Sequence, residues 1–210
     1  MTTLEQLTQS VIAGKSKDAK ALTQLALDEQ HAPGDIVEQA LVPAMAEVGD
    51  RFRRDEIFVP EMLVSARAMK ESLAVLEPRL LAAGVTPKYI ALIGSVRGDL
   101  HDIGKNLVAI MWKGANFRVI DLGTNVPPSK FVAAIQQHQP HVVGLSTLLT
   151  TTMPAMIETV RAIRSSGCPP VKIMVGGAPV SQQFADEIGA DAYSPDASSA
   201  VEKALALVGA

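Results

Sequence analysis

Residues 89–110, YIALIGSVRGDLHDIGKNLVAI, contain the change of pattern that decides the fold of the second half of the chain. The run from Tyr89 to Gly94 is apolar, as in a buried strand, whereas apolar residues recur at helical spacing from Ile103 onward. The polar stretch between them, GDLHDIGKN at residues 98–106, then lies at the carboxyl end of a strand. Open parallel sheets present ligand-binding residues at that edge. We therefore expect a site there, centred on His101.

The same alternation continues to the end of the chain. Further short runs of strand-forming residues cover positions 116–122, 142–145 and 171–175, with helical segments between them. Such alternation predicts a parallel sheet that is covered on both faces. With five strands in all, the domain looks flavodoxin-like or Rossmann-like, and the loops after its first and third strands flank the ligand-binding crevice. Those two loops carry His101 and Ser146.

The first half of the chain has a different rhythm. Residues 1 to about 80 follow the helical period and predict four amphipathic helices joined by short loops, a four-helix bundle. Leu25 is expected on the buried face of the second helix, Asp35 with Glu38 resembles a capping box that opens the third, and Pro43 predicts a bend. We expect a helical domain at 1–82, a linker at 83–87 and an α/β domain at 88–210.

Composition excludes several classes of partner. The 210 residues carry a formal net charge of −3 with only 4% aromatic residues, so no basic, aromatic surface for nucleic acid is expected. There is no apolar run of about 18 residues and no signal-like start, which predicts a cytoplasmic protein without a membrane partner. The single cysteine, Cys168, allows neither an intrachain disulfide nor a thiolate metal cluster.

The loop pattern D-x-H-x-x-G, from Asp99 through His101 to Gly104, resembles the cobalamin-binding motif of methionine synthase and of the corrinoid proteins of methyl-transfer systems. The resemblance implies that His101 replaces the cofactor's own benzimidazole as the lower ligand to cobalt. It implies that Asp99 orients the imidazole and that Gly104 leaves room for the displaced nucleotide tail. Read without the resemblance, the loop fits equally well a helix start capped by Asp99 or Asp102, with His101 exposed.

Further motifs of the same family follow in order. DLGTNVPPS at 121–129 resembles the family's DLGxDVP turn, with Asn125 in place of the aspartate, and residues 146–148 match its S-x-L. The resemblance implies that Ser146 lies against the nucleotide base and that the glycine pair at 176–177 gives the tail space that a Cβ would fill. The contacts implied in this domain are Gly98, Asp99, Leu100, His101, Asp102, Ile103, Gly104, Ser146, Thr147, Leu148, Thr150, Gly176, Gly177, Tyr193 and Ala197.

A hydroxyl group is expected to extend the Asp99–His101 pair. In methionine synthase a serine six residues beyond the S-x-L serine completes a hydrogen-bonded chain through the aspartate to the histidine, and here that position is Thr152. The resemblance therefore implies a proton relay of Thr152, Asp99 and His101. Threonine is stiffer than serine about χ1, which bears on the geometry of the relay.

The helical half resembles the cap that precedes the cobalamin domain in methionine synthase and in small corrinoid proteins, over residues 43–69. The resemblance implies that Phe52 and Val59 shield the upper face of the corrin and that Glu38 lies near the upper ligand. Val59 is smaller than the family's leucine. Read without the resemblance, Phe52 is ordinary bundle core and Glu38 a helix-capping residue.

Together the resemblances imply the methyl-carrier subunit of a corrinoid-dependent methyltransferase system, which is not a complete enzyme alone. Its cobalamin or related cobamide would pass through Co(I), Co(II) and Co(III) states, with methylcobalamin as the methylated form. The implied partners are a donor-specific methyltransferase, a second methyltransferase that uses tetrahydrofolate or coenzyme M, and a reductive activase. Alternatives are an adenosylcobalamin-dependent mutase subunit, a cobalamin-sensing regulator, and a zinc or iron hydrolase that uses His101 with His138 and His141.

Overall fold

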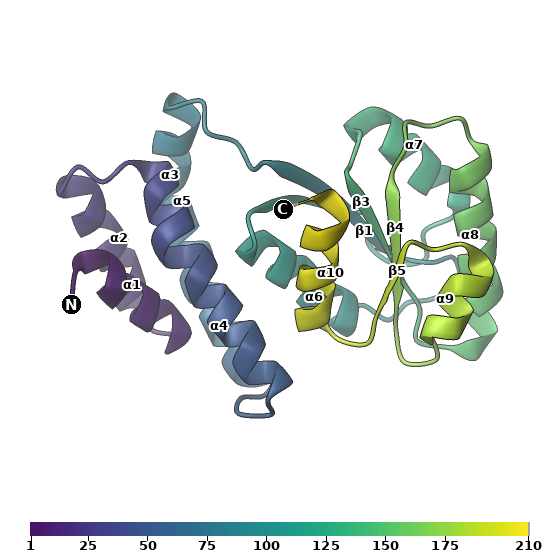
Figure 1. Cartoon of the computed structure of the whole chain (residues 1–210), viewed down its shortest axis with the longest axis horizontal. Coiled ribbons are helices and arrows are strands. Elements are labelled where there is room, and N and C mark those ends of the chain that lie inside the picture. Colours follow the sequence, from purple (N-terminus) through teal and green to yellow (C-terminus); the bar gives the residue numbers. More distant parts are fainter. Residues whose placement is uncertain (210) are drawn as a thin grey trace. The chain divides into compact units, whose positions relative to one another are not determined.

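The computed structural model describes residues 1–209 as two compact units, each with its own buried core (Figure 1). The first comprises Met1–Pro87 with Gly114–Asn116, and the second comprises Lys88–Lys113 together with the residues from Phe117 onward. Among the described residues, no helix has both the length and the apolar character that a membrane span requires.

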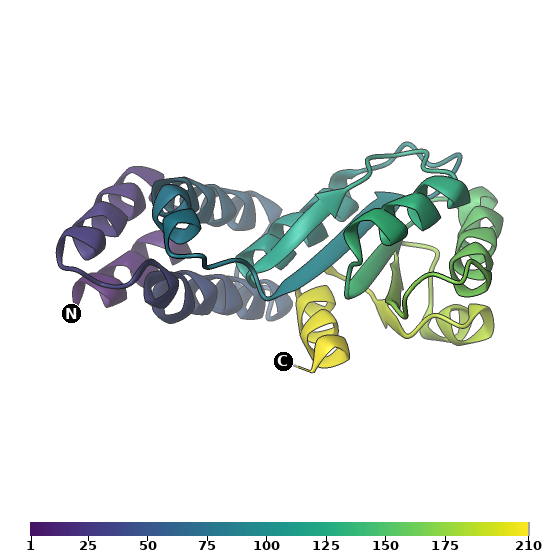
Figure 2. The same cartoon turned by 90° about the horizontal axis from the view of Figure 1, so that it is seen from above.

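The first unit is a helical bundle. In both views its helices, coloured purple to blue, lie next to one another (Figures 1 and 2), and α1 and α2 both pack against the long helix α5. The helices are α1 (Thr3–Ile12), α2 (Ser16–Asp28), α3 (Pro33–Ile36), the π-helical segment η1 (Val37–Leu41), α4 (Val42–Arg53) and α5 (Val59–Ala82). Leu25 is 46% exposed, so its predicted place in the core is wrong, and the hydroxyl-bearing Thr23 is buried on α2 instead.

The third helical stretch begins differently from the prediction. Its first residue is Pro33, whose fixed φ suits the first position of a helix, and no side chain caps it. The predicted capping box of Asp35 and Glu38 is therefore wrong, because both residues lie beyond the start of the helix. Just before Pro43, which has no N–H to donate, the segment η1 forms a π turn in which the N–H of Val42 donates to the carbonyl of Val37.

The second unit contains a five-stranded sheet in the order β2-β1-β3-β4-β5, with every neighbouring pair parallel. This order is flavodoxin-like, which confirms the predicted fold class. The strands are β1 (Tyr89–Ser95), β2 (Phe117–Asp121), β3 (Val142–Ser146), β4 (Lys172–Gly176) and β5 (Ala192–Ser194). The second strand starts one residue later than predicted, because Asn116 adopts a left-handed turn conformation with φ of 62°.

Helices cover both faces of this sheet (Figure 1). Buried side chains of α7, α8 and α9 pack with those of the strands in one core cluster. On the other face, the fully buried Trp112 of α6 packs over Gly144 and donates a hydrogen bond from Nε1 to the carbonyl of Ala200 in α10, at 3.0 Å. The helices are α6 (Ile103–Gly114), α7 (Pro128–His138), the 3-10 segment η2 (Thr150–Thr152), α8 (Met153–Ser165), α9 (Gln182–Ile188) and α10 (Ala197–Val208).

Candidate cofactor-binding site

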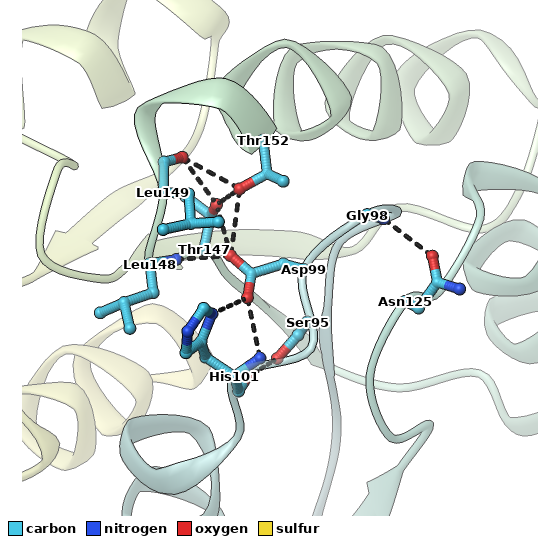
Figure 3. Close-up of polar contacts among 9 residues, drawn as sticks. All are labelled: Ser95, Gly98, Asp99, His101, Asn125, Thr147, Leu148, Leu149 and Thr152. Carbon is cyan, nitrogen blue, oxygen red and sulfur yellow. Dashed lines mark hydrogen bonds and ion pairs between the residues drawn. The ribbon is translucent and has the colours of Figure 1, made fainter.

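The loop between β1 and α6 is fixed by hydrogen bonds at both of its ends (Figure 3). Gly98 has φ of +85°, and its N–H donates to Oδ1 of Asn125 at 2.8 Å. The N–H of Asn125 donates in turn to the carbonyl of Asp99, also at 2.8 Å. The hydroxyl of Ser95, the last residue of β1, donates to the carbonyl of His101 at 2.7 Å. Asn125 thus supplies the side-chain acceptor at the position where the family carries aspartate.

Asp99 is the centre of this loop and its side chain is completely buried. One carboxylate oxygen, Oδ1, accepts from the backbone N–H of His101 and lies 2.9 Å from Nδ1 of the same residue. The other, Oδ2, accepts from the N–H of Leu148 at 2.6 Å and from the hydroxyls of Thr147 and Thr152, each at 3.0 Å. The carboxyl group therefore joins the loops that follow β1 and β3.

These bonds determine the protonation state of Asp99. Burial alone would raise the pKa of its carboxyl group, because it removes water from the charged form. The hydrogen bonds from Leu148, His101 and Thr147 outweigh that effect and hold the pKa of Asp99 well below its usual range. Asp99 is therefore an ionised carboxylate in the folded protein.

His101 is oriented by this carboxylate but remains open to solvent, since half of its side chain is exposed. Nδ1 is directed at Asp99 (Figure 3), and the other ring nitrogen, Nε2, has no hydrogen-bond partner among residues 1–209. A neutral imidazole with Nδ1–H on a carboxylate presents the Nε2 lone pair, which is the arrangement of metal-binding histidines.

A metal bound at this imidazole would have to bring its remaining ligands with it. Within the described chain no three histidine, cysteine or acidic side chains are grouped closely enough to hold a metal ion. His141 precedes β3 and its Nδ1 accepts from the N–H of Ile90 near the start of β1, so it lies at the amino edge of the sheet, away from His101. A hydrolase centre that combines these histidines is therefore excluded.

The structure brings Thr152 to Asp99, as the relay requires, and adds a second hydroxyl. The hydroxyl oxygen of Thr147 lies 2.5 Å from that of Thr152, and both contact the same carboxylate oxygen. From the sequence, Thr147 was predicted only as a cofactor contact. It is the variable residue of the S-x-L motif, and the motif does not say which way that side chain points. Ser95 and Lys105, both buried, were also missed, and no spacing signal in the sequence marks either of them.

Apolar side chains surround His101 on the surface. In the described part of the second unit, the large hydrophobic residues that are exposed all belong to this edge: Leu100, Ile103, Leu148 and Leu149. Leu100 and Ile103 are each more than 70% exposed. Exposed apolar residues gathered in this way mark a binding surface. Their position in the loops that carry His101 and contact Asp99 suits a flat, largely apolar ligand that carries its own metal.

The predicted glycines play two different roles. A Cβ added to Gly104 would meet nothing within 4 Å, so this residue opens onto free space. A Cβ on Gly177, which has φ of +123°, would lie only 1.7 Å from the carbonyl oxygen of Thr147, and one on Gly176 would lie 2.9 Å from that of Ser194. The protein's own backbone therefore already requires glycine at 176 and 177, whether or not a ligand is bound.

The other predicted contacts of the second unit lie on the same edge of the sheet or beside it. Gly98 and Asp102 belong to the β1–α6 loop, Ser146 ends β3, and Thr150 begins η2. Tyr193 lies in β5, and Ala197, which is buried, is the first residue of α10. The predicted residues of the first unit are Glu38, exposed in η1, Phe52, half-buried in α4, and Val59, half-buried at the start of α5.

A flavodoxin-like sheet with one carboxylate-oriented imidazole in an apolar surround defines a protein that binds a metal-carrying macrocycle. The chain belongs to the B12-binding family: a B12 binding domain model matches residues 89–204, and a second one matches residues 3–77. It is a cobalamin-binding corrinoid protein of methyltransferase systems, and its cofactor is cobalamin or a related corrinoid.

Its relatives match along the whole chain. It is 39% identical to a corrinoid protein of Desulfitobacterium hafniense over 213 residues, covering 100% of this chain and 99% of the relative. It is 38% identical to dimethylamine corrinoid protein 2 of Methanosarcina mazei, covering 98% and 96%. Its structure matches a chain of the methanol:cobalamin methyltransferase complex of Methanosarcina barkeri with a TM-score of 0.88 at 28% identity, covering 99% of this chain and 80% of that chain.

Proposed function

We propose that this protein carries a methyl group between two methyltransferases and that His101 is the lower ligand to the cobalt of its corrinoid. The observation that supports this most directly is the 2.9 Å contact between Nδ1 of His101 and buried, ionised Asp99. That contact leaves Nε2 as the one nitrogen presented toward the apolar surface. When bound, the corrinoid supplies the methyl-transfer chemistry.

The residues of the second unit divide the binding task. Asp99 holds the imidazole in one tautomer, and the hydroxyls of Thr152 and Thr147 donate hydrogen bonds to its Oδ2 atom, which extends the relay that we propose through Asp99 to His101. Gly104 gives clearance for the nucleotide tail. We assign contacts with that tail to Ser146, Tyr193 and Ala197, and contacts with the macrocycle to the exposed apolar residues around His101.

For the first unit we propose the role of a cap. Phe52 and Val59 would shield the upper face of the corrin, and Glu38 would lie near its upper ligand. The proposed boundary places the cap at 1–82 and the linker at 83–87. The linker would let the cap move aside when a partner needs access, a gating role common to lids.

The partners follow from the relatives. One solved structure similar to this chain is a methanol:cobalamin methyltransferase complex, and several relatives are dimethylamine corrinoid proteins. We propose that this chain works in the cytoplasm with a donor-specific methyltransferase, with a second methyltransferase that delivers to tetrahydrofolate or coenzyme M, and with a reductive activase. Donor choice lies in the partner, so methyl transfer assays with dimethylamine-specific and methanol-specific methyltransferases would identify the donor.

The ligand assignment is tested by electron paramagnetic resonance of the reconstituted Co(II) protein. Wild type should show coupling to one imidazole nitrogen, and His101→Ala should lose it while His138→Ala, half-buried at the end of α7, keeps it. Nitrogen coupling that survives in His101→Ala would show that another group ligates the cobalt.

A further inference from the structure

Lys105 occupies a position that helix physics disfavours. It is the third residue of α6, yet its side chain is only 2% exposed. A cation in the first turn of a helix is opposed by the helix dipole, and a buried ammonium costs several kcal/mol unless it is paired. Local rules broken in this way are usually compensated by a specific interaction or a function.

Two side chains accept hydrogen bonds from the ammonium group of Lys105. Nζ donates to Oδ2 of Asp121, at the end of β2, at 2.6 Å, and to Oδ1 of Asn106 at 2.7 Å. Asn106 donates through its side-chain amide to Oδ2 of Asp102 at 3.0 Å and through its backbone N–H to the carbonyl of Asp102 at 2.7 Å. A continuous polar chain thus runs from the end of β2 to the residue that follows His101.

Asp121 is itself held in place. Its second oxygen, Oδ1, accepts from the N–H of Gly123 at 2.9 Å, which ties the carboxylate to its own turn. The polar chain therefore starts at the carboxyl end of β2, where Asp121 is bonded to its own turn. From β2 the polar chain reaches the loop that carries His101. Asp99 connects the same loop to the segment after β3, on the other side of β1.

We propose that Lys105 is a positioning residue for His101. It fixes the carboxyl-terminal end of the loop to β2, while Asp99 fixes the imidazole ring, and both anchors are needed to keep Nε2 at one place. The inference rests on the proposed role of His101 as cobalt ligand. Lys105 itself touches neither the imidazole nor the apolar surface.

The test is Lys105→Met, which keeps the length of the side chain and removes its charge, with Lys113→Met on the exposed last turn of the same helix as control. Direct hydrogen-bond partners of metal-binding histidines contribute about 10- to 100-fold to metal binding. Lys105 acts through the loop, so we expect an effect at the lower end of this range, about a tenfold lower ratio of histidine-bound to histidine-free Co(II). The ratio is measured by electron paramagnetic resonance at equal corrinoid occupancy. A purely structural role would lower occupancy or stability and leave this ratio unchanged.

A second variant and a second readout decide the remaining outcomes. Asp121→Asn keeps the shape of the side chain but weakens its bond to Lys105. It should therefore lower the ratio of histidine-bound to histidine-free Co(II) by less than Lys105→Met does. It also replaces Lys105→Met as the test if that variant does not fold. Amide hydrogen exchange of the protein without corrinoid should be faster at His101 and Asn106 in both variants. An unchanged ratio would overturn the positioning role, whether or not the exchange becomes faster. Nitrogen coupling that persists in His101→Ala would refute only the ligand assignment, because the exchange readout does not depend on cobalt.

Discussion

At the scale of single residues, the buried side chain of Asp99 serves both the fold and the candidate site. It accepts hydrogen bonds from the loops after β1 and β3 and fixes the tautomer of His101. Because these bonds reach a buried charge, each is worth more than a bond between neutral groups. The same contacts that prepare the imidazole therefore also stabilise the fold.

The ionisation of Asp99 should appear in the acid stability of the protein. Its folded pKa lies below the unfolded value of about 3.9, so its contribution is complete above that pH and is lost as the pH falls further. Asp99→Asn should cost about 2 to 4 kcal/mol near neutral pH and should flatten the loss of stability below about pH 4. Urea unfolding at several pH values measures both effects. Asp186→Asn, on the exposed face of α9, should change neither, and an equally steep acid limb in Asp99→Asn would contradict the assignment.

The glycines should separate a backbone requirement from a ligand requirement. Gly177→Ala should destabilise the protein without cofactor by about 3 kcal/mol or more, because the new methyl group overlaps the carbonyl of Thr147. Gly104→Ala should be neutral or stabilising by up to about 1 kcal/mol in the helix.

Gly104→Leu should weaken the binding of complete cobalamin much more than that of cobinamide, which lacks the tail base. Equal loss of both ligands, measured by titration, would show that Gly104 does not provide tail clearance.

At the scale of secondary-structure elements, the sequence predicts the strands better than the helix starts. Buried parallel strands are short apolar runs ended by turn residues, so β1 and β3 are recognisable without a structure. The start of the third helical stretch was mispredicted, because a proline at its first position competes with an acidic pair a few residues later. The π turn before Pro43 has no sequence rule of its own.

Within the candidate site, too, the sequence predicts some residues and misses others. His101, Asp99 and Gly104 follow from a local motif, because three residues in one loop carry its chemistry. Thr147 and Lys105 do not, because their roles depend on contacts with residues 48 and 16 positions away in sequence, Asp99 and Asp121. Pattern reasoning finds residues that share a loop. Residues that reach the loop from elsewhere come either from the family resemblance, as Thr152 does from 53 positions beyond Asp99, or from the fold.

At the scale of the whole molecule, the two units have different spectroscopic reporters. Trp112 is the only tryptophan of the sequence, and it is fully buried between α6 and the sheet of the second unit. Its fluorescence therefore follows the unfolding of that unit. Far-ultraviolet circular dichroism follows the helices of both units.

A core substitution in the bundle should separate the two signals. Leu7 is fully buried in α1, so Leu7→Ala should cost about 2 to 5 kcal/mol. We expect the circular dichroism transition in urea to shift to lower concentration while the Trp112 transition moves much less. Ile173→Val, in the core of the second unit, should shift the fluorescence transition instead. If Leu7→Ala moved both signals together, the units would unfold as one cooperative body.

The exposed apolar side chains around His101 have a consequence for how the protein is made in the cell. In the complex that we propose, the corrinoid covers Leu100, Ile103, Leu148 and Leu149, whereas a newly folded chain without cofactor presents them as a surface of the kind that promotes self-association. Binding of the corrinoid to the native state alone adds stability in proportion to the logarithm of its concentration. The yield of soluble protein should therefore depend on the supply of the vitamin, and expression that outpaces this supply should fill the cell with aggregates instead of carrier.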